Sequence, residues 1–421
     1  MGITEIPKGF KTLLPNETAK REKLFTIMEQ VIKLWGYDLL IPPTIEFLST
    51  FKAVDERFEE ISFKVVDRET GKLMAVRPDF TPQVARIVAS SFKDENPPFR
   101  FYYKGKVFRD QEGKRETYQI GFELIGVNEP EADAEIVSII VNVLEKLGLK
   151  SFQIDIGNSK FIDGVIEELK IPSPTSFTKL LSSKDISGIE LFIEEHKITG
   201  ERREKILTLL DLYGKEEILD KAAQTFSNKQ SLSAIKRLKE IFEILKSYGF
   251  ESKVIFDLSE KKGMKYHTGI TYEVFHPLLG CSLASGGRYD QLLKKFGRNL
   301  PATGIAINVD SLQELLEKKG IFEEEKKDFY IIDLKKERKL AYEVAKGLRE
   351  RGFSVARDII KRKAEESIKT AFEKGYKYVI VLNRKNKAPH NIYLSPQKHF
   401  ALNGDKLIES VISIITKENQ Q

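Results

Sequence analysis

Apolar residues recur at helical spacing near the start of the chain. Between Thr18 and Trp35 they fall at intervals typical of one helix face, and Gly36 follows as a common end to a helix. The next apolar run, 39–41, stops at Pro42 and Pro43, which cannot donate the backbone hydrogen bonds of a strand. We therefore expect an amphipathic helix followed by a short strand.

Short apolar runs then predict a series of strands. They lie at residues 63–66, 73–76, 99–108, 121–126 and 152–156, with turn sequences at 69–71 and 112–113. Antiparallel pairing is favoured, because the pattern does not alternate strand with helix as a parallel sheet requires.

The pattern changes to Lys/Glu-rich helical periodicity from about residue 173 to residue 250, as in SAIKRLKEIFEILKSYG. Strands are expected again at 253–257, 271–275 and 282–285. The sequence GGRYD, residues 286–290, then leads into a predicted helix at 289–296. The block 173–250 is therefore interpreted as a helical insertion in a sheet domain.

A charged stretch at 320–328 is the best candidate for a linker between domains. Beyond it, FYIIDL, FSVARD and YKYVIVL alternate with two helical segments as β-α-β-α-β. We predict an α+β fold for residues 1–325, with an antiparallel sheet, flanking helices and the helical insertion. Residues 326–421 are expected to form a small C-terminal α/β domain.

The composition is that of a globular protein. The 421 residues are 41% hydrophobic and 31% charged, and the net charge of +6 is only a weak indication of a polyanionic partner. Cys281 is the single cysteine, the five histidines show no zinc-ligand spacing, and no apolar run is long enough for a membrane span. With no apolar signal region at the start, we expect a reducing, cytoplasmic location and no metal.

Candidate chemistry rests on polar residues in and beside the predicted strands, because no P-loop, nucleophile elbow, HExxH or dinucleotide fingerprint is present. Arg109 ends a strand, and Gln119 and Glu123 share strand parity and so project to one face. Asp79 and Thr81 directly follow the strand at 73–76. Taken singly, these residues have ordinary explanations as an edge-strand charge, an exposed acid and a helix cap.

Further candidates surround the predicted strand at 271–275. Lys262, Tyr266 and His267 precede it in KKGMKYHTGITYE, and Tyr289 lies in GGRYD. A lone histidine is more often structural than ligand-binding, and a short glycine motif is weak by itself. The two glycines would nevertheless permit close approach of the backbone to a ligand.

The order of these segments resembles the histidyl-tRNA synthetases over about the first 315 residues. GYDLLIPPTIE resembles motif 1 of the class II synthetases, KVFRDQ through ELIG resembles motif 2, and ATGIAINVDSL resembles motif 3. AVRPDFTP resembles the TRPEGT segment of that family, and KKGMKYHTGITYE and GGRYD resemble its two histidine motifs. The resemblance implies a class II synthetase-like fold, a dimer formed through motif 1 and a C-terminal domain like the anticodon-binding domain.

The departures from this resemblance fall on residues that would handle ATP. Ser311 stands where motif 3 of the synthetases has the arginine of GLER, and a hydroxyl cannot supply the bidentate charge of a guanidinium. Gln111 replaces the glutamate after the motif 2 arginine, and Lys262 replaces the catalytic arginine of the first histidine motif. Phe80 fills the place of the TRPEGT glycine.

The residues expected to bind ATP have changed, whereas those expected to bind the amino acid are kept. In this respect the sequence resembles the ATP phosphoribosyltransferase regulatory subunits, which are synthetase paralogues that sense histidine. The resemblance implies a non-catalytic subunit for the first step of histidine biosynthesis, assembled with a separate short-form catalytic subunit as a hetero-octamer. It also implies free L-histidine as a feedback effector, no cofactor, and no role for tRNA. The residues it implies for histidine binding are Asp79, Thr81, Arg109, Gln119, Glu123, Lys262, Tyr266, His267 and Tyr289.

A histidine pocket needs an acid for the ammonium group, a cation for the carboxylate and an acceptor for the ring N–H. Asp79 can supply the first, Arg109 or Lys262 the second, and Glu123 the third. Buried polar partners of this kind discriminate against ligands that lack the matching groups.

Two alternatives remain open from the sequence. One is an active or divergent histidyl-tRNA synthetase, against which Ser311 and Gln111 argue. The other is an RNA-binding paralogue that uses the basic stretch RDIIKRKAEESIK of the C-terminal domain, for which a solvated helix face is the more ordinary explanation.

Overall fold

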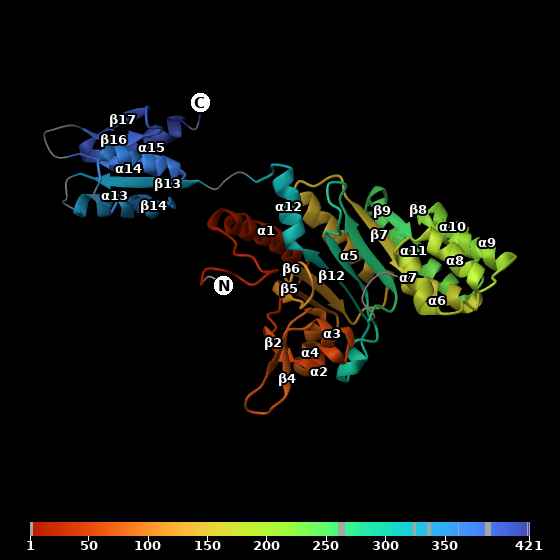
Figure 1. The fold of residues 1–421 in the computed structure, drawn as a ribbon. Helices are drawn as coiled ribbons and strands as arrows, with labels where there is room; N and C mark the ends of the chain where they lie inside the picture. Colours follow the sequence, from red (N-terminus) through yellow and green to blue (C-terminus); the bar gives the residue numbers. More distant parts are fainter. Residues whose placement is uncertain are drawn as a thin grey trace. The chain divides into compact units, whose positions relative to one another are not determined.

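The structure, a computed structural model, describes residues 3–259, 266–322, 326–334, 338–360, 362–383, 389–418 and 420. The candidate Lys262 lies outside these residues. The chain forms two compact units, Met1–Phe322 and Glu323–Gln421, which are described separately (Figure 1).

A nine-stranded sheet forms the centre of the first unit, with strand order β1-β5-β6-β12-β11-β10-β7-β9-β8. Its strands are β1 (Asp38–Leu39), β5 (Phe99–Phe108), β6 (Glu116–Ile125), β7 (Gln153–Asn158), β8 (Tyr213–Gly214), β9 (Val254–Asp257), β10 (Ile270–Phe275), β11 (Ala284–Arg288) and β12 (Ala302–Asn308). Neighbours pair antiparallel except β1 with β5 and β7 with β9. The expected antiparallel sheet is therefore confirmed over most of its width.

Three helices pack against this sheet in the largest hydrophobic core: α1 (Pro15–Leu34), α5 (Pro130–Lys146) and α12 (Val309–Lys318). The apolar stripe predicted for the first helix is buried as expected, with Leu24, Met28 and Ile32 fully covered. Helix α5 is buried at every position from Ile136 to Val141, which is typical of a helix covered on all sides.

A second core lies under a small sheet with order β2-β4-β3. Its elements are β2 (Ile45–Phe47), β3 (Lys64–Val66), β4 (Leu73–Val76), α2 (Leu48–Lys52), α3 (Arg57–Ile61) and α4 (Thr81–Ser91). Both pairings are antiparallel, and β3 and β4 are joined by the turn predicted at 69–71. Strand β2 was not predicted from the sequence.

A block of helices gathers beside the end of the large sheet that carries β7, β9 and β8 (Figure 1). It consists of α6 (Ser159–Glu168), α7 (Pro174–Ser182), α8 (Ile186–Glu195), α9 (Glu201–Leu210), α10 (Glu217–Thr225), α11 (Lys229–Ser247) and the 3₁₀ turn η1 (Glu251–Lys253). Within it, Tyr213 and Gly214 pair with β9 as a short strand that the sequence pattern did not reveal.

The second unit contains a five-stranded sheet with order β14-β13-β15-β16-β17. Its elements are β13 (Lys327–Asp333), α13 (Lys339–Arg349), β14 (Val355–Arg357), α14 (Ala364–Glu373), β15 (Tyr376–Leu382), β16 (His390–Tyr393), β17 (His399–Leu402), η3 (Gly404–Lys406) and α15 (Leu407–Glu418). Helices α13 and α15 cover one face and α14 the other. The predicted β-α-β-α-β succession is parallel, whereas the antiparallel β16 and β17 and the closing helix were not predicted.

The region of GGRYD differs from its sequence prediction. Residues 286–288 belong to strand β11, and a Cβ at Gly286 would collide with the backbone of β12, so glycine allows the two strands to pair closely. The helix expected at 289–296 is wrong in extent, because the structure has only the 3₁₀ turn η2 (Leu293–Phe296). That turn ends at Gly297, whose φ of +90° favours glycine.

Candidate functional site

A polar pocket opens on one face of the large sheet, which we call the front pocket. It encloses about 270 Å³ and receives side chains from β6, β10, β11, β12, the start of α4 and the end of β5. Eight of the nine predicted site residues line it: Asp79, Thr81, Arg109, Gln119, Glu123, Tyr266, His267 and Tyr289. The pocket thus joins predicted residues, Asp79 and Tyr289, that are 210 positions apart in the sequence.

Strand register brings the central groups of the front pocket together. Gln119 and Glu123 lie on the same side of β6, as their parity predicted, and Glu123 pairs across the ladder with Gly304 of β12. A Cβ at Gly304 would overlap the Glu123 carboxylate, so the absence of a side chain there makes room for the acid. Gly304 was not among the predicted site residues.

Glu123 is the most buried acid of the pocket, with 1% of its surface exposed. Its Oε1 accepts hydrogen bonds from the hydroxyls of Thr81 at 2.8 Å and Tyr103 at 3.3 Å, and Oε2 accepts from the hydroxyl of Tyr289. Burial raises the pKa of Glu123 to about 7, although the Tyr289 and Thr81 hydroxyls act in the opposite direction. The carboxyl group is therefore poised to change protonation near neutral pH.

Asp79 forms the second acidic centre. Its Oδ1 accepts the Thr81 backbone N–H at 2.9 Å, and Oδ2 accepts the Tyr266 hydroxyl at 3.3 Å. Burial raises the pKa of Asp79, while the charge of Arg109 and the Thr81 N–H lower it. Arg109 is half-buried, and its Nε donates to the Pro78 carbonyl at 3.2 Å.

His267 lies beside these groups as an uncharged ring. Burial lowers its pKa to about 4, so the imidazole is neutral at physiological pH. Its ring centroid lies 4.9 Å from that of Tyr266, which in turn lies 6.0 Å from the ring of Tyr289. The three rings form a wall of the front pocket that can offer both apolar contact and hydroxyl groups.

Phe80 packs against Tyr103, one of the hydroxyl donors to Glu123. Its ring stacks on Tyr103 with centroids 4.4 Å apart, and the guanidinium of Arg77 lies over its other side at 4.2 Å. Sequence reasoning identified Phe80 only as a departure and missed Tyr103, although a tyrosine in the row Phe99, Phe101, Tyr103 was a signal for a buried hydroxyl.

A buried ion pair anchors the end of strand β11, directly before Tyr289. Arg288 of β11 reaches Asp133 of α5, with Nε to Oδ1 at 3.1 Å, and Asp133 also accepts the Tyr272 hydroxyl at 2.7 Å. Asp133 is fully buried and Arg288 is 4% exposed. Because the pair spans 155 positions of sequence, no local pattern could have identified it.

The other end of the front pocket has a different lining, supplied by Thr117, Glu273, Ser282 and Asn308. Asn308 caps α12 by accepting the Ser311 N–H at 3.2 Å, which places Ser311 in the first turn of that helix. Gln111 is exposed in the turn between β5 and β6. Arg109 is thus the one guanidinium that the described residues contribute to the pocket lining.

The described residues show neither a metal centre nor a membrane-spanning helix. The described part of the chain contains no group of three or more His, Cys, Asp or Glu side chains placed to hold a metal ion. Within those same residues, no helix combines the length and the apolar character needed to cross a membrane.

Comparison with known proteins identifies the family. The family model for histidyl-tRNA synthetase matches residues 9–312. The ATP phosphoribosyltransferase regulatory subunit of Syntrophotalea carbinolica is 36% identical over 388 residues, covering 90% of each chain, and that of Geobacter metallireducens is 37% identical over 371 residues, covering 86% of each. The chain belongs to the family of ATP phosphoribosyltransferase regulatory subunits.

Solved structures agree with this assignment to the regulatory-subunit family. A Bacillus halodurans protein described as an ATP phosphoribosyltransferase regulatory subunit/histidyl-tRNA synthetase superposes with a TM-score of 0.82 at 28% identity, covering 90% of this chain and 98% of its own. A histidyl-tRNA synthetase from a Nostoc species gives a TM-score of 0.75 at 22% identity, covering 98% and 100%, and so shares the fold. The class II synthetase-like fold expected from the motifs is confirmed.

Proposed function

We propose that this chain is a histidine-binding regulatory subunit that works with a separate catalytic ATP phosphoribosyltransferase. The convergence of eight predicted residues on the front pocket supports this proposal most strongly. The relatives of this chain from Syntrophotalea carbinolica and Geobacter metallireducens are named as regulatory subunits of that enzyme.

The front pocket offers the partners that a histidine zwitterion needs. Asp79 and the Thr81 hydroxyl can hold the ammonium group, and Arg109 can pair with the carboxylate. Glu123 can accept the ring N–H in place of one of its present hydroxyl donors. About 270 Å³ is enough space for one amino acid.

The same pocket is poorly equipped for activating an amino acid with ATP. Phosphate charge at the end lined by Thr117 and Asn308 would meet the Glu273 carboxylate, with Arg109 as the single guanidinium among the described lining residues. Ser311 supplies a hydroxyl where the synthetases have an arginine. We infer that the chain binds histidine without forming histidyl-adenylate, which ranks an active histidyl-tRNA synthetase as the second candidate.

Self-association belongs to the same proposal. The motif 1 segment exposes Leu39 and Ile41, with 40% and 81% of their surfaces accessible, and β1 is an edge strand; Leu34, at the end of the preceding helix α1, is 88% exposed. Apolar residues on an open edge favour pairing with another chain. We propose a dimer through this edge, assembled with catalytic subunits into a hetero-octamer in the cytoplasm.

Feedback inhibition of the assembled complex tests the proposed function. Glu123→Gln removes a charge-assisted bond worth about 1.5–3 kcal/mol, so half-inhibition should need roughly 10-fold more histidine or higher. Glu190→Gln, the same change on the exposed surface of α8, serves as the matched control. An unchanged inhibition curve in an intact Glu123→Gln complex would show that histidine acts elsewhere.

A further inference from the structure

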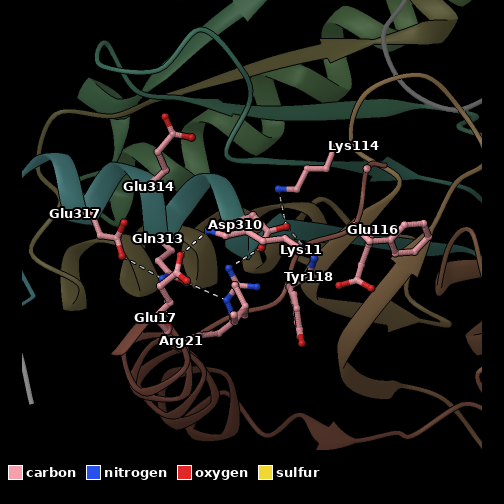
Figure 2. A pocket seen from close by; sticks show the side chains of 13 residues that line it. Lys11, Glu17, Arg21, Lys114, Glu116, Tyr118, Asp310, Gln313, Glu314 and Glu317 are labelled. Atoms are coloured by element: carbon pink, nitrogen blue, oxygen red, sulfur yellow. Dashed lines mark hydrogen bonds and ion pairs between the residues drawn. The ribbon is translucent and has the colours of Figure 1, made fainter. Parts of the chain in front are cut away.

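A second pocket lies on the opposite side of β6, and we call it the back pocket. It encloses about 430 Å³ between the segment 9–13, helix α1, the start of β6 and helix α12 (Figure 2). Because side chains alternate along a strand, Thr117 and Gln119 line the front pocket, whereas Glu116 and Tyr118 line the back pocket.

Arg21 of α1 is the buried cation of the back pocket, with 5% of its surface exposed. Its Nε donates to Gln313 Oε1 at 2.9 Å, its Nη2 lies 2.6 Å from Asp310 Oδ1, and the guanidinium stacks on Tyr118 at 4.4 Å from the ring centroid. A guanidinium has five N–H donors. The described residues provide no partner for Nη1, so one edge of this buried group remains available.

The neighbours of Arg21 hold it in place. Gln313 Nε2 donates to the Glu17 carbonyl at 3.3 Å and to Glu317 Oε1 at 3.1 Å, which fixes the orientation of the amide. Asp310 also pairs with Lys114 at 2.7 Å and accepts the Tyr118 backbone N–H at 3.1 Å. Figure 2 shows these side chains of α1 and α12 turned toward one another. The free edge is therefore pre-organised and need not be ordered by a ligand.

The charges around the free edge select the kind of ligand. The lining has three cations and five carboxylates: Lys11, Arg21, Lys114, Glu17, Glu116, Asp310, Glu314 and Glu317. A free phosphate or a simple carboxylic acid would bind Arg21 but would be repelled by the surplus of acids. A molecule that carries both a carboxylate and an ammonium group satisfies both conditions.

Helix α12 supplies the acids for such an ammonium group. Glu314 and Glu317 are three residues apart and so share the helix face that carries Asp310 and Gln313. Glu314 is 59% exposed in its side chain and pairs with Lys318 at 2.8 Å, a surface contact that is easily exchanged.

We propose that the back pocket binds the zwitterionic head group of a free amino acid. The carboxylate would lie on the Nη1 edge of Arg21, and the ammonium group would face Glu314 and Glu317. The site does not depend on the front pocket binding histidine. The two pockets lie close together along β6. Asp310 of the back pocket accepts the backbone N–H of Tyr118, and the next residue, Gln119, lines the front pocket.

Calorimetric titration of the full chain can test the back pocket. The Asp79→Asn chain, in which the front pocket is impaired, is titrated with each of the twenty standard L-amino acids and with inorganic phosphate. We expect at least one amino acid to bind, whereas its decarboxylated amine, its deaminated acid and phosphate bind at least about 10-fold more weakly. Failure of every amino acid to bind at millimolar concentration, or tighter binding of phosphate, would overturn the proposal.

Two variants assign the binding to this pocket. Arg21→Lys keeps the charge but loses the planar fork, and should weaken binding about 10-fold. The exposed change Glu314→Gln should weaken it several-fold and keeps the Gln313–Glu317 contact that orients Arg21, so it remains informative if Arg21→Lys is unstable. Binding that is unaffected by the folded Glu314→Gln variant would contradict the site.

Discussion

The two ends of the front pocket differ in the polar groups that they offer to a ligand. At one end, Asp79, Glu123 and their hydroxyl partners form a closed hydrogen-bonding network. At the other end, six residues away along β6, Thr117 lies among Glu273, Ser282 and Asn308, and α12 offers Ser311. Under the proposed function, recognition of an amino acid and its activation by ATP would occupy separable parts of one sheet, so that one can be kept while the other is lost.

The largest expected effect is the absence of adenylate chemistry. Because the described pocket residues supply one guanidinium, histidine-dependent pyrophosphate exchange should be about 10³-fold or more below that of a histidyl-tRNA synthetase assayed in parallel. Exchange at a comparable rate would show that the end of the pocket lined by Thr117 and Asn308 still handles ATP, and would favour the synthetase alternative.

The next effect concerns the space beside Glu123. Gly304→Ala places a methyl group into the carboxylate, so we expect histidine affinity to fall about 100-fold in a calorimetric titration. Gly280→Ala is the matched control, because no atom lies within 4 Å of its added Cβ. Thermal unfolding of both variants shows whether the chain stays folded, and normal affinity in folded Gly304→Ala would separate Glu123 from the binding site.

A ligand series tests the cation of the pocket. Histamine and histidinol lack the carboxylate that Arg109 is expected to pair with, so each should bind roughly 10- to 100-fold more weakly than histidine. Calorimetry with the three compounds measures the difference. Equal affinities would show that Arg109 does not pair with the histidine carboxylate.

The smallest effect is a pH dependence centred on Glu123. Its pKa of about 7 in the empty pocket should fall when a ring N–H binds the carboxylate, so binding releases a proton near neutral pH and affinity rises from pH 6 to pH 8 by roughly 5- to 10-fold. Titrations in two buffers of different ionisation enthalpy measure the proton. Glu123→Gln should retain only the titration of the ligand itself, and equal proton release by both proteins would assign it to another group.

The sequence revealed the elements that have a strong local pattern. Strand β5 has the predicted bounds 99–108, and Gln119 and Glu123 share a face because parity along a strand is a local property. The resemblance to the synthetases supplied the long-range grouping of Asp79, Tyr266 and Tyr289, which no local pattern contains.

The features that escaped prediction depend on tertiary contacts. Gly304 matters because β12 pairs with β6 at Glu123, and Arg288 matters because it reaches Asp133 on a distant helix. The GGRYD segment extends a strand because β10 and β12 flank it on both sides, which overrides its turn-like composition. The back pocket similarly exists only where α1 and α12 meet β6.

Direct binding of histidine to the isolated full chain tests the central claim most simply. We predict that calorimetry detects binding of L-histidine to the natural protein, and that Asp79→Asn weakens it by about 10-fold or more because the ammonium group loses its charged partner. Asp94→Asn, the same change at an exposed position, should bind as the natural protein does. No detectable binding at millimolar histidine, or identical binding by Asp79→Asn, would contradict the front pocket as a histidine sensor.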